Sequence, residues 1–287
     1  SPRTMSNQQY SPMRWQILPP VVKNLMIING IMYLATVVLD ERLGLNLTQY
    51  LGLHYFTSEF FRPHQFLTHL FMHGSLAHIA MNMFSLWMFG NVLENVWGGK
   101  KFLIYYLITG MGAALIHTGF TWYEMSQLQH SVDLFKSYAS PEDFSLFVTR
   151  YNHLIGFNEM MSVNDFIESW RKVPADAAMI QEAASYADMI VQRKANIPTV
   201  GASGAVYGVL LAYGMMFPNT LIYVYLFLPI KAKWFVFIFG AIELYTGLQN
   251  NPGDNVAHFA HLGGMLFGYL LIRSWKRKMI RPFDDQM

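Results

Sequence analysis

Apolar stretches long enough to cross a membrane constrain this chain more than any other feature. The first covers residues 21–39, with charges only near its ends, at Lys23 and Asp40. A helix of about 20 residues spans a bilayer core of roughly 30 Å and satisfies its own backbone hydrogen bonds there. Charged residues make up 13% of the chain, whereas soluble domains contain about 25%. The sequence therefore predicts an all-α, multispanning membrane protein.

Six membrane spans are expected, separated by turn residues, prolines or charges. They cover residues 21–39, 65–90, 102–120, 199–217, 234–248 and 256–275. The segments 40–64 and 218–233 are expected at the membrane interface. The corresponding domains are a lead at 1–20, spans one to three in 21–122, an insert at 123–198, spans four to six in 199–275, and a tail at 276–287. Residues 1–4, which precede Met5, are expected to have been added for expression.

The insert at 123–198 differs from the rest of the chain in charge. It contains ten acidic and six basic residues, so it cannot lie in hydrocarbon. The run Ser140-Pro141-Glu142-Asp143 has the N-cap, first-position proline and first-turn acids that begin helices. Apolar residues follow it at helical spacing. We expect an extramembrane cap of short amphipathic helices, over the start of the fourth span, rather than a flexible linker.

Basic residues indicate the orientation. In a six-span layout those near the chain start, in the loops after spans two and four, and in the tail fall on one side, opposite the acidic insert. Positively charged loops remain in the cytoplasm. Both termini are therefore predicted to be cytoplasmic.

A lone serine among small residues is the first candidate for chemistry. Residues 201–208 read Gly-Ala-Ser-Gly-Ala-Val-Tyr-Gly and begin the fourth span. Ser203 is thus expected at a helix N-terminus, where free N–H groups and a partial positive charge surround its hydroxyl. Small residues also allow close packing between membrane helices. The run alone fits either a nucleophile or a packing seam.

Two polar residues of the second span share one helix face. His78 and Asn82 are four residues apart, and both side chains can donate a hydrogen bond to one oxygen. Ser75 is the expected N-cap of their helix. Because polar residues also join neighbouring membrane helices, the spacing leaves both roles open.

Two histidines, His258 and His261, begin the sixth span. Gly264 and Gly268 form a GxxxG face behind them, which permits close approach to the glycine-rich fourth span. In the six-span layout Ser203 and a histidine would enter from the same surface to about equal depth. A serine and an imidazole so placed make a nucleophile and its base.

Glu243 in the fifth span is the acid at a comparable depth. It could orient the base or bind a neighbouring helix, and its sequence surroundings do not mark it as a triad member, so a Ser-His dyad is expected. The chain contains no cysteine, which excludes disulfides, thiolate metal sites and cysteine nucleophiles. No metal or other cofactor is expected.

Together these motifs resemble those of the rhomboid family of intramembrane serine proteases. The resemblance covers nearly all of the membrane part, through residues 78–82, 201–204 and 257–268. It implies a rhomboid-like six-helix transmembrane bundle that cleaves peptide bonds in or next to transmembrane segments of substrate proteins. It also implies a bacterial inner (plasma) membrane location. The insert is the departure, because bacterial-type members usually have a much shorter loop there.

The resemblance also implies residue roles. Ser203 would be the nucleophile and His261, rather than His258, the general base. His78 and Asn82 would be oxyanion donors beside the Ser203 N–H. The supporting residues would be Tyr207, stacked on the base, with Gly201 and Gly264 in the packing, while Glu94 and the Arg62-Pro63 loop would be structural.

Other function classes fit less well. A catalytically inactive relative that binds membrane segments as a chaperone would lack the serine or the base, and both are present. A metalloprotease would need a His-Glu-x-x-His motif, and no Glu lies between His69 and His73. A transporter would need charged residues midway through spans two, four and six, and the sequence has none there. The net charge of +2, with no basic run carrying interleaved aromatics, argues against nucleic acid.

Overall fold

The computed structural model describes residues 15–224, 227–249 and 256–280, the last five by their backbone alone. Residues 1–4, most of the expected lead, most of the loop after span five and most of the expected tail lie outside these ranges. The elements are α1 (Pro20–Leu43), α2 (Leu47–Leu51), α3 (Gln65–Thr68), η1 (His69–Phe71), α4 (Leu76–Ser85), η2 (Leu86–Gly90), α5 (Asn91–Trp97), α6 (Gly99–Tyr138), α7 (Pro141–Arg150), η3 (Asn152–Leu154), α8 (Phe157–Lys172), α9 (Ala177–Ala195), α10 (Ser203–Met216), β1 (Leu221–Val224), β2 (Leu228–Lys231), α11 (Ala232–Gln249) and α12 (His258–Ile280).

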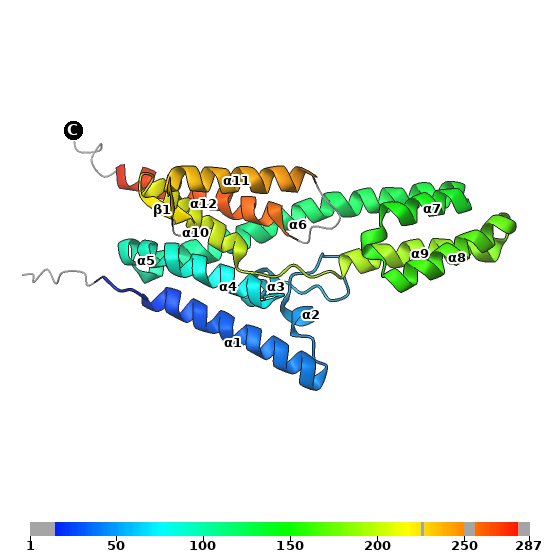
Figure 1. Ribbon diagram of the computed structural model, residues 1–287, viewed down its shortest axis with the longest axis horizontal. Helices are drawn as coiled ribbons and strands as arrows, with labels where there is room; N and C mark the ends of the chain where they lie inside the picture. Colours follow the sequence, from blue (N-terminus) through cyan, green and yellow to red (C-terminus); the bar gives the residue numbers. More distant parts are fainter. Residues whose placement is uncertain (1–14, 225–226, 250–255, 281–287) are drawn as a thin grey trace, which may run out of the picture.

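Within the described ranges, six helical passes form one bundle (Figure 1). They are α1, the run α4–η2–α5, α6, α10, α11 and α12. The first pass begins and the last ends at the same end of the bundle, and the insert projects from the opposite end. Three of the described helices are long and apolar enough to cross a membrane: Pro20–Leu43, Leu76–Trp97 and Gly99–Tyr138. The predicted all-α membrane class is confirmed.

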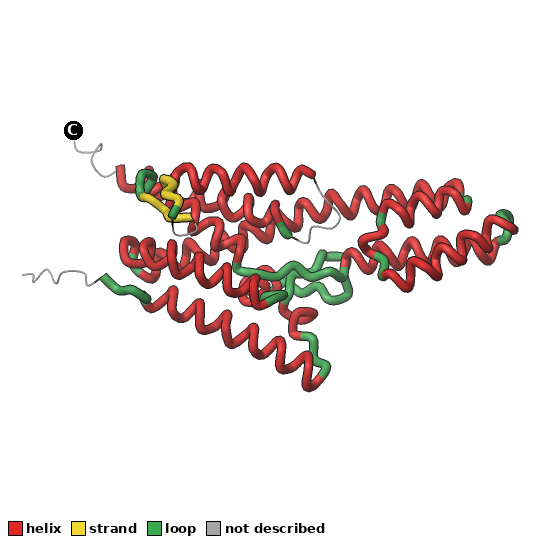
Figure 2. The backbone as a smooth tube through the Cα atoms, in the orientation of Figure 1, coloured by secondary structure: helices red, strands yellow, loops and turns green. Residues whose placement is uncertain are grey.

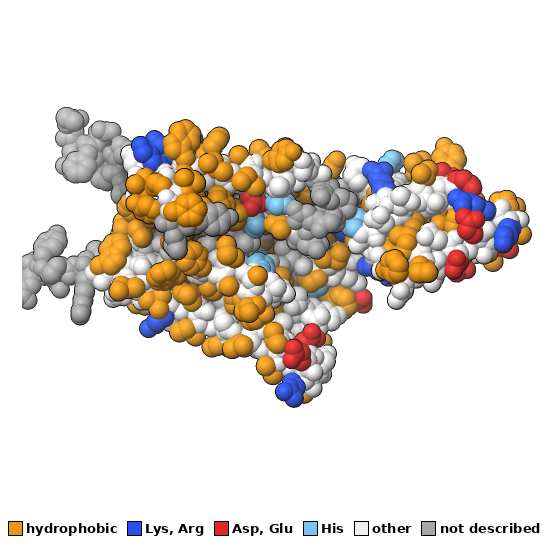
Figure 3. Space-filling view, viewed as in Figure 1, with side chains coloured by type: hydrophobic (Ala, Val, Ile, Leu, Met, Phe, Trp, Pro, Cys, Tyr) orange, Lys and Arg blue, Asp and Glu red, His pale blue; other side chains and the backbone are white. Residues whose placement is uncertain are grey.

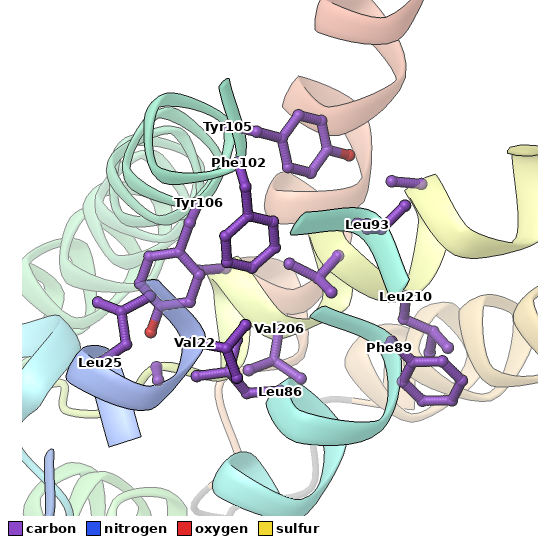
Figure 4. Packing of buried hydrophobic residues seen from close by; sticks show 14 of the residues in the cluster. Val22, Leu25, Leu86, Phe89, Leu93, Phe102, Tyr105, Tyr106, Val206 and Leu210 are labelled. Atoms are coloured by element: carbon purple, nitrogen blue, oxygen red, sulfur yellow. The ribbon is translucent and has the colours of Figure 1, made fainter. Parts of the chain in front are cut away.

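Close-packed aromatic and aliphatic side chains form the core of the bundle (Figure 4). Phe102, Tyr105 and Tyr106 of α6 are fully buried. The Tyr105 hydroxyl donates a 2.7 Å hydrogen bond to the Gly208 carbonyl oxygen of α10. Burial of these rings and this bond fix α6 against α10, the helix that begins with the candidate serine.

Helix α1 is capped from a distant part of the chain. The buried carboxylate of Glu94 in α5 accepts hydrogen bonds from the backbone N–H groups of Val21, at 2.9 Å, and Val22, at 2.7 Å. Pro20 occupies the first helical position, where no N–H is needed. Glu94 thus satisfies free N–H groups at the helix start, which is the structural role that the resemblance implies.

The second pass begins at its predicted N-cap and ends later than predicted. Its first residues, from Gln65, form the short elements α3 and η1, and the membrane helix begins after Ser75. The Ser75 hydroxyl accepts a 3.1 Å bond from the His78 N–H, which confirms the predicted N-cap. The helix passes its expected end at Gly90 and stops at Gly98, whose φ of 80° L-residues rarely adopt. A glycine inside a helix, such as Gly90, lowers helix stability by only about 1 kcal/mol, so it does not end the helix.

The third pass continues without a break into the insert. Helix α6 has 40 residues, a length of about 60 Å at 1.5 Å per residue, twice a bilayer core. The expected boundary between residues 122 and 123 therefore lies inside a helix. The sequence of α6 contains no proline that would break the helix. The helix therefore continues from its apolar first half into its polar second half.

The insert forms a helical arm with its own core. The end of α6 packs with α7 and α9, and α7 packs with α8. Trp170, Ala183, Ala187 and Ile190 are fully buried at the centre of this separate cluster. Acidic and basic side chains gather on the arm, whereas hydrophobic side chains cover much of the bundle (Figure 3). A packed core of this kind confirms helices rather than a flexible linker.

One prediction concerns pH and the arm. Arg193 binds Glu159 through both carboxylate oxygens, at 2.8 and 3.0 Å, and this hydrogen bonding lowers the pKa of Glu159 below its usual value. A lowered folded-state pKa contributes stability that is present above the unfolded pKa, near 4.5, and lost as pH falls through the folded value. Because the pair is about one-third exposed, we expect about 0.5–1 kcal/mol. Protection factors of the amides in α8 and α9, which are corrected for the intrinsic pH dependence of amide exchange, should fall below about pH 4.5 in the wild type. This fall should be smaller in Glu159→Gln and unchanged in the exposed-site control Glu182→Gln.

The segment 218–233, expected at the interface, contains a β-hairpin (yellow in Figure 2). The strands β1 and β2 pair antiparallel, with Leu221 opposite Lys231 and Val224 opposite Leu228. No strand is predicted from the sequence here. The two apolar runs are too short to cross a membrane, and they satisfy part of their backbone hydrogen-bonding groups by pairing with each other.

Candidate active site

The segment before Ser203 is held by backbone pairing to the first loop. Leu53 and Thr199 exchange two backbone hydrogen bonds, at 2.9 and 2.8 Å, and Gly201 N–H donates to the His69 carbonyl at 2.9 Å. The Thr199 hydroxyl also lies 2.8 Å from His117 Nε2. These contacts fix the chain two residues before the serine, so the position of the hydroxyl does not depend on α10 alone.

Ser203 is the first residue of α10, as the sequence predicts. Gly201 has a φ of +127°, a conformation that favours glycine. A Cβ at Gly201 would lie 2.8 Å from His78 Nε2 and 3.6 Å from Ser203 Oγ. Glycine therefore keeps open a space bordered by the imidazole and the serine hydroxyl.

Close contact between α10 and α12 depends on glycine. A Cβ at Gly264 would overlap the carbonyl oxygen of Gly204, and one at Gly268 would overlap the hydroxyl of Tyr105. The predicted GxxxG face thus packs directly against the backbone of α10.

This approach brings the predicted nucleophile and base together. His261 Nε2 lies 2.8 Å from Ser203 Oγ, within hydrogen-bonding distance. The Tyr207 ring stacks on the His261 imidazole at a centroid distance of 4.2 Å and an angle of 7°. His261 is 7% exposed, so its ring has little freedom to turn away from the serine.

Glu243 of α11 completes the arrangement on the other side of the imidazole. Its Oε2 atom lies 2.9 Å from His261 Nδ1 and 2.6 Å from His258 Nδ1, and its Oε1 atom accepts a hydrogen bond from the Tyr207 hydroxyl. The N–H direction of His261 Nδ1 is poorly aligned for a hydrogen bond, so at this distance the contact is mainly electrostatic. The sequence predicts a Ser-His dyad, and the structure places a buried carboxylate beside His261 as well.

The second predicted pair of polar groups, His78 and Asn82, lies one helical turn apart in α4. His78 is half-buried and borders the space beside Gly201. Asn82 is 5% exposed, and its Nδ2 donor has no hydrogen-bond partner among the described residues. A buried amide without a partner is uncommon. It leaves a donor available for an atom that the protein itself does not supply.

One set of side chains in the described ranges has ligand atoms close enough for a metal ion. The atoms of Glu243, His258 and His261 lie within 4.8 Å of one another. An ion there would compete with the contacts just described, which already pair these groups. His69 and His73, the pair considered for a metalloprotease, are not in such a set.

Glu243 is the residue of this site that is least clearly indicated by the sequence. A signal was present, because Gly240, Glu243 and Gly247 repeat at helical spacing. A Cβ at Gly240 would lie 3.2 Å from Met265, and one at Gly247 would lie 3.1 Å from His258 Cβ. Small residues on both sides of Glu243 thus mark the face of α11 that packs on α12.

Comparison with known proteins is consistent with this arrangement. The Rhomboid domain profile matches residues 60–129 and 177–276, which together are more than half of the chain. The chain is also similar to Rhomboid-like protein 11, chloroplastic, from Arabidopsis thaliana, with 28% identity over 184 residues. That alignment covers 63% of this chain and 56% of the relative, so the chain spans little more than half of the relative's length. The family profile leaves out residues 130–176, which lie in the arm.

Proposed function

We propose that this chain, which belongs to the Rhomboid family, is an intramembrane serine endopeptidase. It is an integral membrane protein, and its proposed substrates are proteins with a transmembrane segment. The observation that carries the proposal is the 2.8 Å contact between Ser203 Oγ and His261 Nε2, with Tyr207 stacked on the imidazole. This is the geometry of a nucleophile and its general base.

The proposed reaction begins with the serine hydroxyl. Ser203 Oγ attacks a peptide carbonyl carbon while its proton moves to His261 Nε2. As the C–N bond breaks, the same proton passes to the leaving amine and an acyl-enzyme remains. Water then hydrolyses the ester with His261 again acting as base.

The developing negative charge needs donors on the other side of the serine. We assign this role to His78, to the Asn82 amide and to the Ser203 N–H. Because Ser203 is the first residue of α10, its N–H has no carbonyl partner within the helix and can bind the oxyanion. The free Asn82 Nδ2 donor supports the assignment.

The depth of the serine fits a substrate within the bilayer. Helix α10 has 14 residues, a length of about 21 Å, which is shorter than a bilayer core of about 30 Å. If its C-terminal end reaches one surface, Ser203 lies below the other. A substrate helix must unwind locally to present a carbonyl there, because an intact helix hides its backbone groups. We place both termini in the cytoplasm, as the basic loops indicate, in a bacterial plasma membrane.

A serine-directed probe tests the proposal. Purified wild-type protein in detergent should be labelled by a fluorophosphonate, whereas Ser203→Ala and His261→Ala should not. In liposomes the wild type should also cleave a single-span substrate, and Ser203→Ala should bind it without cleavage. Labelling of Ser203→Ala equal to the wild type would exclude this serine. A wild type that binds membrane segments but neither labels nor cleaves would be the inactive, chaperone-like relative.

A further inference from the structure

The contacts of Glu243 converge on the base rather than on a structural partner. Among the described residues, Glu243 binds or pairs with three side chains, and each either is His261 or lies against it: Tyr207 stacks on the imidazole, and the His258 ring lies one helical turn away, at a centroid distance of 6.4 Å. Glu243 and His261 are each 7% exposed. A carboxylate that served only to join α11 to α10 would need the Tyr207 bond alone.

We propose that Glu243 is a positioning residue that makes the Ser203–His261 pair a Ser-His-Glu triad. The inference rests on the proposed function, because it concerns how the same base is held. An ionised carboxylate can only accept hydrogen bonds. Its place beside Nδ1 therefore favours the tautomer with the proton on Nδ1, which leaves the Nε2 lone pair directed at the serine.

The carboxylate also acts during the reaction. When Ser203 Oγ bonds to the carbonyl carbon and its proton moves to Nε2, the imidazole gains a positive charge 2.9 Å from Glu243 Oε2. The low-dielectric surroundings strengthen this attraction. Glu243 stays ionised and transfers no proton, since the Nε2 proton leaves with the amine when the C–N bond breaks.

Tyr207 and His258 hold the carboxylate in turn. The Tyr207 hydroxyl binds Oε1 and His258 Nδ1 lies against Oε2, while the Thr246 hydroxyl lies 3.1 Å from His258 Nδ1. Tyr207 thus has two functions, since its ring stacks on the base and its hydroxyl orients the acid.

The test compares Glu243→Gln with Glu94→Gln, the same substitution at a buried carboxylate far from the serine. For Glu243→Gln we expect kcat on a single-span substrate in liposomes to fall about 10- to 100-fold, less than the loss seen when a triad acid is removed from a soluble protease. KM should change less than about twofold, since losing the orientation and charge stabilisation of the base acts on the chemical step. Fluorophosphonate labelling should slow to the same extent. Glu94→Gln should lower the unfolding temperature and leave kcat of the folded fraction unchanged.

A folded Glu243→Gln protein with wild-type kcat would overturn the proposal and make Glu243 a structural residue. If that variant does not fold, Tyr207→Phe keeps the stacked ring and removes only the hydroxyl on Oε1. Its kcat should fall several-fold at unchanged KM, and a wild-type kcat would equally overturn the inference. Absence of labelling in the wild type would instead contradict the proposed function, so the two failures are distinguishable.

Discussion

Replacing Gly264 with Ala should reduce the labelling rate of Ser203 by at least about a hundredfold, the effect of moving a catalytic group by about 1 Å. A Cβ at this position would overlap the Gly204 carbonyl oxygen. Because that neighbour is backbone, α12 must move away from α10. His261 lies one helical turn before Gly264 and would move with the helix, which lengthens its 2.8 Å contact to Ser203. The rate of fluorophosphonate labelling of the folded protein measures the effect.

The control is Gly119→Ala, because a Cβ at Gly119 in α6 would meet nothing within 4 Å. Removing a helical glycine at an open site should stabilise the protein by about 0.5–1 kcal/mol and leave labelling unchanged. If Gly264→Ala labels at the wild-type rate, close packing of α10 and α12 does not set the distance between serine and base.

The passes of the bundle could be predicted from sequence because a membrane helix is specified locally. Length, hydropathy and the capping residue Ser75 suffice to locate where such helices begin within a few residues. The exact ends were less predictable. Glycine at position 90 resembles a terminus, yet it lies buried within a helix, and the true end at Gly98 depends on a positive φ that sequence alone does not reveal.

The contact between Ser203 and His261 was predictable for a different reason. Ser203 begins α10 and His261 lies in the first turn of α12, and equal depth on adjacent glycine-rich helices brings them together. The choice of His261 over His258 came from the family resemblance. The role of Glu243 was not predictable in this way, because a single carboxylate in an apolar helix fits several partners. Its contact with His261 depends on the rotation of α11 about its axis, which the packing of Gly240 and Gly247 against α12 determines.

Replacing Asn82 with Ala should lower kcat by about 10²- to 10³-fold, the usual cost of removing one oxyanion donor. The same change should not lower the unfolding temperature. Asn82 Nδ2 is buried without a partner in the described ranges, and removing an unsatisfied buried donor is neutral or stabilising. A residue that joined two helices would show the reverse, a lower unfolding temperature at unchanged kcat, so the two roles that the sequence left open for Asn82 separate in one variant.

The matched control for Asn82→Ala is Asn29→Ala in α1. Asn29 is also buried, and its Oδ1 acceptor likewise has no partner among the described residues, but its Nδ2 donates a 2.8 Å hydrogen bond to the Leu25 carbonyl oxygen, a contact typically worth about 1 kcal/mol. Its replacement should lower the unfolding temperature and leave kcat of the folded protein unchanged. Loss of kcat with retained stability in Asn82→Ala alone would therefore separate a donor held for the reaction from one used in the fold. Equal stability losses in the two variants would contradict the oxyanion role of Asn82.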